Sequence, residues 1–236
     1  MEKAGFRFKQ FVVEHSDVAM KVGTDSIMLG SWVKPGNARR MLDVGTGSGL
    51  LALMLAQEAG AADFDIVAID IDQAAVEQAG RNIAASLWSD KIRVFYQSLQ
   101  LCEKGPFDLI ISNPPYYPAG QSFDPQRQQA RHQAGLNFDD LMRHVARLLA
   151  DNGRFACVIP AQFERQLLNS AAQSALYLNR RLAVKSTPNK AVSRLLLEFS
   201  AQQAASADKV QLFIRNLNGE YSEDYKNLCR EFYLNF

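Results

Sequence analysis

Apolar runs alternate with helix-like stretches through most of the chain, beginning near Arg39. The runs are rich in Val, Ile, Leu and Phe, as buried strands are, and they lie at 40–45, 64–71, 91–97, 107–112 and 153–160. Helical periodicity occupies 48–60, 73–86 and 137–149, and Asp72 and Asn137 are expected to cap the last two helices. This alternation predicts repeated βα units on a mostly parallel sheet.

The pattern changes after Pro160. A helix is expected at 163–174, followed by two alternating runs at 176–186 and 193–201. The connection between these runs is too short for a parallel crossover, so we expect the two strands to pair antiparallel at the edge of the sheet. The whole pattern predicts an α/β fold with a Rossmann-like, seven-stranded, mostly parallel sheet, a C-terminal antiparallel hairpin and helices on both faces.

The chain is expected to form a single domain over 1–236, because no repeat or low-complexity linker divides it. Residues 1–38 form an N-terminal lead-in, with a short strand or two and a helix that starts near Thr24. Residues 39–200 form the core, and 201–236 contribute a C-terminal strand and helix. We expect that last helix to pack against the core.

Amino-acid composition argues against a metal-binding or membrane-spanning protein but does not decide whether the chain binds nucleic acid. The chain has 236 residues, of which 47% are hydrophobic and 22% charged, and its net charge of +1 neither favours nor excludes a polyanionic partner. The three cysteines lie far apart, without the spacing of a metal site. No stretch has the length and apolarity of a membrane span. We therefore expect a cytoplasmic protein with no metal and no membrane partner.

A glycine-rich turn joins the first core strand to the first core helix. It contains Asp43, Gly45, Gly47 and Gly49, with the spacing GxGxG instead of the GxGxxG of a dinucleotide site. An acid directly before the turn suits a ligand with an ammonium or sulfonium group. The next strand ends in Asp70, whose carboxylate can accept both hydroxyls of a ribose. Together these residues predict an adenosine-like ligand with a positively charged tail.

The strand at 107–112 ends in the sequence NPPYY, residues 113–117, and two prolines must stop the strand and stiffen the backbone after it. The DxGxGxG turn, Asp70, NPPYY and the closing hairpin together resemble the class I S-adenosylmethionine-dependent methyltransferases, from Met41 to about Ser200. The resemblance implies S-adenosylmethionine as methyl donor, bound by Asp43, the three glycines and Asp70.

The resemblance also implies roles for NPPYY, since families with this motif methylate planar nitrogens. Such a nitrogen is a poor nucleophile, and acceptors for both amino hydrogens would stabilise the charge that develops on it. Asn113 Oδ1 and the Pro114 carbonyl are the expected catalytic acceptors, and Tyr116 is expected to stack on the target. Tyr117 is less defined and could serve packing alone.

NPPYY leaves adenine N6, guanine N2 and a glutamine amide open as targets. The lead-in, NPPYY and the tail together resemble the bacterial methyltransferases that modify N6 of adenine 37 in a valine tRNA. This implies that Lys21, Thr24 and Asp25 lie over the methionine end of the donor, although Thr24 and Asp25 could equally be a helix cap and a first-turn acid. Ser98 stands where the wider class usually has an acid for the donor's adenine.

A tRNA partner requires basic residues near the target site. The candidates are Arg127, Arg131, His132, Arg181, Lys185, Lys190 and Arg194, with further basic residues at Arg180 and at the N-terminus. The alternatives are a protein glutamine N5-methyltransferase, another RNA or DNA amino-methyltransferase, an NAD-dependent oxidoreductase, and a non-catalytic RNA-binding protein with an adenosine ligand.

Overall fold

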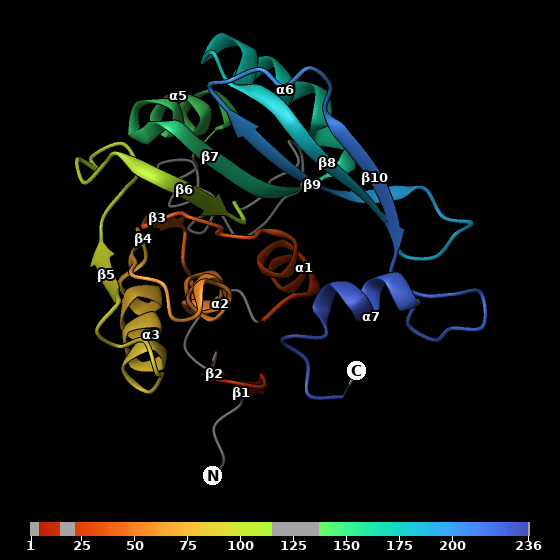
Figure 1. Cartoon of the computed structure of the whole chain (residues 1–236), viewed down its shortest axis with the longest axis horizontal. Helices are drawn as coiled ribbons and strands as arrows, with labels where there is room; N and C mark the ends of the chain where they lie inside the picture. Colours follow the sequence, from red (N-terminus) through yellow and green to blue (C-terminus); the bar gives the residue numbers. More distant parts are fainter. Residues whose placement is uncertain (1–4, 15–21, 115–136, 236) are drawn as a thin grey trace, which may run out of the picture.

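The computed structural model describes residues 5–14, 22–114 and 137–235, and within them eight strands form one large sheet. Their order across the sheet is β10-β8-β9-β7-β6-β3-β4-β5, shown in Figure 1. The strands are β3 Arg40–Val44, β4 Asp65–Asp70, β5 Ile92–Tyr96, β6 Phe107–Ser112, β7 Leu149–Pro160, β8 Tyr177–Lys185, β9 Val192–Ser200 and β10 Asp208–Phe213. Strands β3 to β7 are mutually parallel, which confirms the predicted α/β fold.

The predicted C-terminal hairpin is also confirmed, because β8 and β9 pair antiparallel. Strand β9 inserts next to β7, and β8 is not the edge of the sheet, since β10 pairs with it in parallel. The expected C-terminal strand therefore joins the sheet itself and gives it one strand more than the seven expected.

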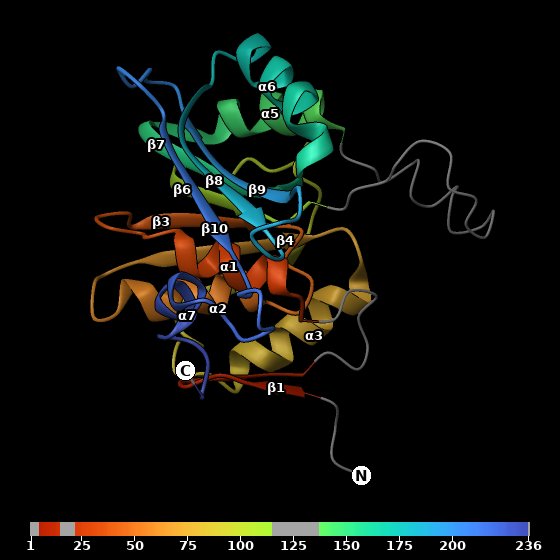
Figure 2. The ribbon, with the colours of Figure 1, turned by 90° about the vertical axis from the view of Figure 1, so that its right-hand side faces the viewer.

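Helices cover both faces of the sheet, as predicted (Figures 1 and 2). One face is covered by α1 Thr24–Trp32, α2 Leu50–Ala59, α3 Gln73–Ala84 and α7 Glu223–Cys229; the other is covered by α5 Phe138–Leu148 and α6 Glu164–Gln173, which follows the short 3-10 turn η1 Ala161–Phe163. A separate antiparallel pair, β1 Gly5–Arg7 and β2 Val12–Glu14, lies outside the layer of α2 and α3.

Polar side chains at the N-termini of α3 and α5 cap these helices and so fix where they begin. Asp72 accepts a hydrogen bond from Ala74 N at 3.0 Å, and Asn137 accepts one from Asp140 N at 2.7 Å, which confirms both predicted caps. The cap of α1 is Gly23, not Thr24, and makes no side-chain capping bond. Asp25 is a first-turn acid, as expected for a residue near the positive end of a helix.

The larger of two buried apolar clusters draws on all three expected parts of the chain. Phe8 and Leu29 come from the lead-in, Leu53 from the core, and Tyr225 and Phe232 from the C-terminal part. This burial bears out the expectation that the last helix packs on the core. The lead-in and the tail are therefore parts of the same packed unit as the sheet.

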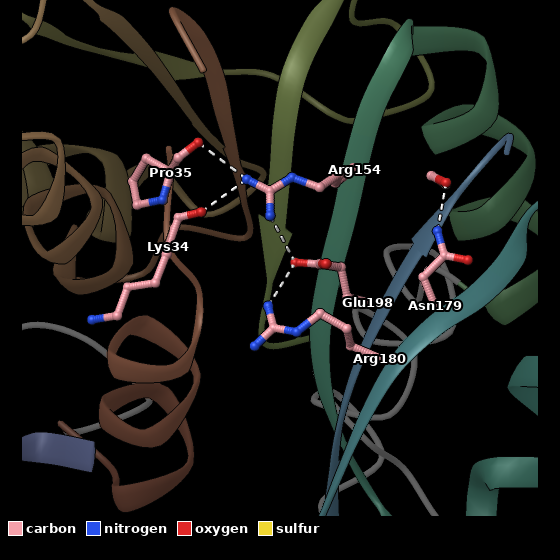
Figure 3. Close-up of polar contacts among 7 residues, drawn as sticks. Lys34, Pro35, Arg154, Asn179, Arg180 and Glu198 are labelled. Carbon is pink, nitrogen blue, oxygen red and sulfur yellow. Dashed lines mark hydrogen bonds and ion pairs between the residues drawn. The ribbon is translucent and has the colours of Figure 1, made fainter. Parts of the chain in front are cut away.

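A buried charge joins the end of α1 to the sheet, as Figure 3 shows. The Glu198 carboxylate, 3% exposed, accepts hydrogen bonds from Arg154 Nη1 at 3.2 Å and Arg180 Nη1 at 3.3 Å. Arg154 Nη2 also donates to the carbonyls of Lys34 at 2.8 Å and Pro35 at 3.1 Å, just after α1. The carboxylate thus joins β9 to β7 and β8, and Arg154 joins β7 to the chain that leaves α1.

Candidate active site

The glycine turn between β3 and α2 lies at the carboxyl edge of the sheet, where ligands of open α/β folds bind. Gly45, Gly47 and Gly49 have φ of 70°, 56° and 83°, a left-handed region that side chains rarely adopt. A Cβ on Gly45 or Gly47 would meet nothing within 4 Å. These two positions border open space, so a ligand can approach the backbone there.

Asp43, at the base of this turn, fits a cationic ligand. Its side chain is fully buried, and Oδ2 accepts from Thr46 Oγ1 at 2.6 Å and from Ala52 N at 3.1 Å. Oδ1 is equally buried and has no partner within the described residues. Burial raises the pKa of this carboxyl to about 7. A positive group near Oδ1 would satisfy the oxygen and restore the charge.

Donor binding should therefore depend on pH. Below about pH 7 Asp43 is protonated, and we expect the dissociation constant of S-adenosylmethionine to rise by about tenfold per pH unit. Without donor, the native carboxyl keeps its proton to higher pH than the unfolded one, so this group lowers the free energy of unfolding as pH rises from about 4 to 7. Calorimetric titration from pH 8 to 5.5 measures the first effect.

The control for this titration is Asp43→Asn, which cannot ionise and should bind weakly with a flatter pH profile. Asp70 contributes to any residual slope, because burial raises its pKa as well. An identical slope in the wild type and in Asp43→Asn would contradict the role of Asp43.

Asp70, at the end of β4, supports the turn from the side. Its Oδ2 accepts from Gly47 N at 2.8 Å and its Oδ1 from Asp72 N at 3.0 Å. A carboxylate has further lone pairs, so these bonds leave it able to accept ribose hydroxyls. Ser98 lies just beyond β5, on the same edge and partly buried. Both assignments to the donor stay predictions.

Asn82 of α3 ties the turn to the first strand pair. Its Nδ2 donates to the carbonyl of Ser48 at 2.8 Å and to that of Glu14 at 2.9 Å. Its Oδ1 accepts from Glu14 N at 3.0 Å. One buried amide therefore connects the glycine turn, α3 and the end of β2.

Asn113 follows β6, one strand from the glycine turn. Ser112 Oγ donates to the carbonyl of Val44 at 2.9 Å and so fixes the end of β6 against β3. Asn113 Nδ2 donates to Ser26 Oγ of α1 at 2.9 Å. Because the amide is planar, this bond turns Asn113 Oδ1 away from Ser26. Pro114 is buried directly after it, and Tyr116 lies outside the described residues.

Removing the hydroxyl of Ser26 should loosen Asn113 without harming the fold, because alanine is favourable in a helix. We expect Ser26→Ala to lower kcat by several-fold to about tenfold, the usual worth of one hydrogen bond, with little change in donor affinity. Steady-state methylation kinetics measure this, and Ser26→Thr, which keeps a hydroxyl, should restore most of the rate. An unchanged kcat in Ser26→Ala would contradict this role.

The start of α1 lies on the other side of Asn113 from the glycine turn. Asp25 Oδ2 accepts from Arg194 Nε of β9 at 2.7 Å, and both residues line a pocket together with Thr24. The placement of Thr24 and Asp25 over the donor stays a prediction, and Lys21 lies outside the described residues.

The basic candidates differ in their surroundings. Arg181 is bound by Glu164 through Nε at 2.6 Å and Nη2 at 3.1 Å, which raises its pKa and occupies its donors. Lys185 Nζ donates to the Pro188 carbonyl at 3.3 Å, and Lys190 is exposed in the same hairpin loop. Arg127, Arg131 and His132 lie outside the described residues. All these assignments stay predictions.

Several residues of the site were not found from the sequence. Ser26 and Asn82 carry no motif, and each acts through a contact with a distant part of the chain. Arg180, counted among the basic candidates, binds Glu198 and lies 4.3 Å from the Trp32 ring. In the described ranges, no helix is long and apolar enough to cross a membrane, and no three His, Cys, Asp or Glu residues gather as a metal site.

The sequence matches known proteins along nearly its whole length. The family model of the methyltransferase small domain matches residues 15–179. A tRNA1(Val) (adenine(37)-N6)-methyltransferase of Aeromonas hydrophila is 44% identical over 232 residues, which is 98% of each chain. One of Bacteroides thetaiotaomicron is 42% identical over 231 residues, 97% of each chain.

Solved structures share the fold at low identity. A predicted O-methyltransferase from Agrobacterium tumefaciens has a TM-score of 0.65 at 17% identity, over 88% of this chain and 96% of its own. The 16S rRNA N2 G1207 methyltransferase of T. Thermophilus, in complex with AdoMet and guanosine, has a TM-score of 0.56 at 19% identity, over 85% of this chain and 50% of its own. These likenesses concern the fold.

Proposed function

Since the chain belongs to the methyltransferase small domain family and to the tRNA1(Val) (adenine(37)-N6)-methyltransferases, we infer that it methylates N6 of adenine 37 in a valine tRNA. The observation that carries this function is the 44% identity to such a methyltransferase over 98% of both chains. The methyl donor is S-adenosylmethionine, which supplies an electrophilic methyl group. A tRNA substrate would place the enzyme in the cytoplasm.

The donor would lie along the glycine turn. Asp43 Oδ1 would face its positively charged end, the open backbone at Gly45 and Gly47 would allow close approach, and Asp70 would accept the ribose hydroxyls. Ser98 would lie near the adenine. The buried Oδ1 of Asp43, which has no partner in the described part of the chain, supports this placement, because a positive group or a hydrogen-bond donor would satisfy it.

Asn113 and Pro114 would act on the target base. The N6 lone pair of adenine is delocalised into the ring, so charge on nitrogen must be stabilised as the new bond forms. Asn113 Oδ1 and the Pro114 carbonyl would each accept an amino hydrogen, and Ser26 would keep the amide turned the right way. No strong base is needed, because the proton can leave after transfer. Tyr116 would stack on the base.

The experiment is methyl transfer from labelled S-adenosylmethionine to total RNA from bacteria that lack this activity, followed by nucleoside analysis. We expect N6-methyladenosine in the tRNA fraction, and mapping should place it at adenine 37 of a valine tRNA. Label in protein would indicate a glutamine N5-methyltransferase, and methylguanosine would indicate another base; either result would overturn the substrate.

A further inference from the structure

A pocket of about 250 Å³ opens at the start of α1, and its lining includes Thr24 and Asp25, the two residues expected near the methionine end of the donor. Its walls come from the start of α1, from β9, from the segment after β10 and from α7. The residues that matter here are Asp25, Arg194, Arg215, Tyr221 and Tyr225. We call it the Arg194–Arg215 pocket.

The pocket lies on the substrate side of Asn113. In the sheet order the glycine turn follows β3, Asn113 follows β6, and Arg194 lies two strands further, on β9 beside Pro160 at the end of β7. Neighbouring strands are about 4.8 Å apart, which puts β9 about 10 Å from β6 along the carboxyl edge. The glycine turn, Asn113 and the pocket therefore follow one another along one edge of the sheet. Helix α1 contacts Asn113 through Ser26 and the pocket through Asp25.

One wall of the pocket is a stack of flat groups. The rings of Tyr225 and Tyr221 are stacked, with centroids 5.2 Å apart and an interplanar angle of 21°. The guanidinium of Arg215 lies over the Tyr221 ring, 4.1 Å from its centroid, and Nη1 donates to the Gly219 carbonyl at 2.6 Å. This hydrogen bond holds the guanidinium in place. Because Arg215 is exposed, its guanidinium extends the stack toward solvent. Guanidinium planes and aromatic rings are the surfaces on which unpaired RNA bases stack.

The pocket also carries positive charge. Arg194 donates through Nε to Asp25 and through Nη1 to the Ser193 carbonyl at 3.0 Å, and its Nη2 has no partner among the residues described. The lining residues include two arginines and one acid, Asp25, and Asp25 forms an ion pair that orients Arg194. A phosphate is the group that such an oriented guanidinium binds best.

We propose that the Arg194–Arg215 pocket binds one unpaired nucleotide of the RNA substrate, close in sequence to the target adenine. Its base stacks on the Arg215 plane and its phosphate is bound by Arg194. This inference rests on the proposed function in one respect, that the substrate is RNA with an unpaired loop. Holding a neighbouring nucleotide would orient the backbone so that the target base can turn toward Asn113.

The test uses the full chain and synthetic anticodon stem-loops of a valine tRNA. In one set, each loop nucleotide other than the target adenine is made abasic in turn, and fluorescence anisotropy gives the RNA dissociation constant for every pair of protein and RNA. For the wild type we expect one abasic position to weaken binding by about tenfold, the usual size of one lost base stack. For Arg215→Ala the intact RNA should bind about tenfold more weakly, and the same abasic change should add little.

Three further variants separate base stacking, phosphate binding and a general loss of positive charge. Arg215→Lys keeps the charge without the plane, so it should lose the coupling to the abasic position. Arg93→Ala removes an exposed arginine from β5, at the opposite edge of the sheet, and should bind every RNA like the wild type. Arg194→Gln should reduce the slope of log affinity against log salt by about one.

Wild-type affinity for intact RNA in Arg215→Ala, or full additivity at every abasic position, would overturn the proposal. Methylation is measured separately on the same RNAs. If the coupling is present but the wild type methylates none of them, the pocket stands and the proposed reaction fails; if methylation occurs without coupling, the reaction stands and the pocket fails.

Discussion

Asn113→Ala is expected to lower kcat for tRNA methylation by on the order of a hundredfold or more while the affinity for S-adenosylmethionine stays nearly unchanged. The side chain would accept a hydrogen bond that strengthens only as charge develops on the target nitrogen, so its loss acts on the transition state. It lies one strand from the glycine turn, and its amide donates to Ser26 of α1. We therefore expect donor binding to be kept.

Single-turnover kinetics and calorimetric donor titration on the same preparation separate the two quantities. Asn113→Asp keeps an acceptor and should lose less rate than Asn113→Ala. Asn152→Ala makes the same change at an exposed site and should match the wild type. A parallel loss of rate and donor affinity in Asn113→Ala would instead make Asn113 part of the donor site.

Glu198→Ala is expected to lower the free energy of unfolding by about 3 kcal/mol, because it leaves Arg154 and Arg180 facing a partly buried cavity without their shared carboxylate. The arginine side chains are 31% and 32% exposed, so water recovers part of the cost. The network lies on the part of β9 away from Arg194, and we expect the donor dissociation constant of the folded variant to stay the same.

Urea unfolding at pH 7 measures this change. Glu198→Gln keeps the volume and one acceptor and should be intermediate, and Glu77→Ala on the exposed face of α3 should change little. A loss below about 1 kcal/mol would mean that the two arginines are solvated well enough without Glu198.

Local chemistry explains what the sequence could predict. The five parallel strands, their helices, the caps Asp72 and Asn137 and the β8–β9 hairpin all follow from periodicity and from residues within a few positions of each other. The glycine turn and Asp70 were likewise predictable, because strand ends and φ requirements are local properties. These features needed no knowledge of which distant segments meet.

What could not be predicted depends on long-range pairing. Strand β10 pairs along β8, and nothing in 208–213 specifies that partner. Glu198 lies in an apolar run, and only the meeting of three strands provides its two arginines. The Asp25–Arg194 and Ser26–Asn113 contacts join residues 169 and 87 positions apart. Such pairs decide which charged residues face solvent and which are already bound.

The three hydrogen bonds that Asn82 makes with the backbone set a limit on how the beginning of this chain can vary. Two of them belong to the backbone of Glu14 and one to Ser48 of the glycine turn. Loss of the first strand pair would remove the Glu14 partners of both polar atoms of this buried amide and leave it, among the residues described, bound only by Ser48 and, at 3.4 Å, by Gln78 Nε2. We therefore expect that a chain shortened past β2, in evolution or in the laboratory, would first lose affinity for the methyl donor.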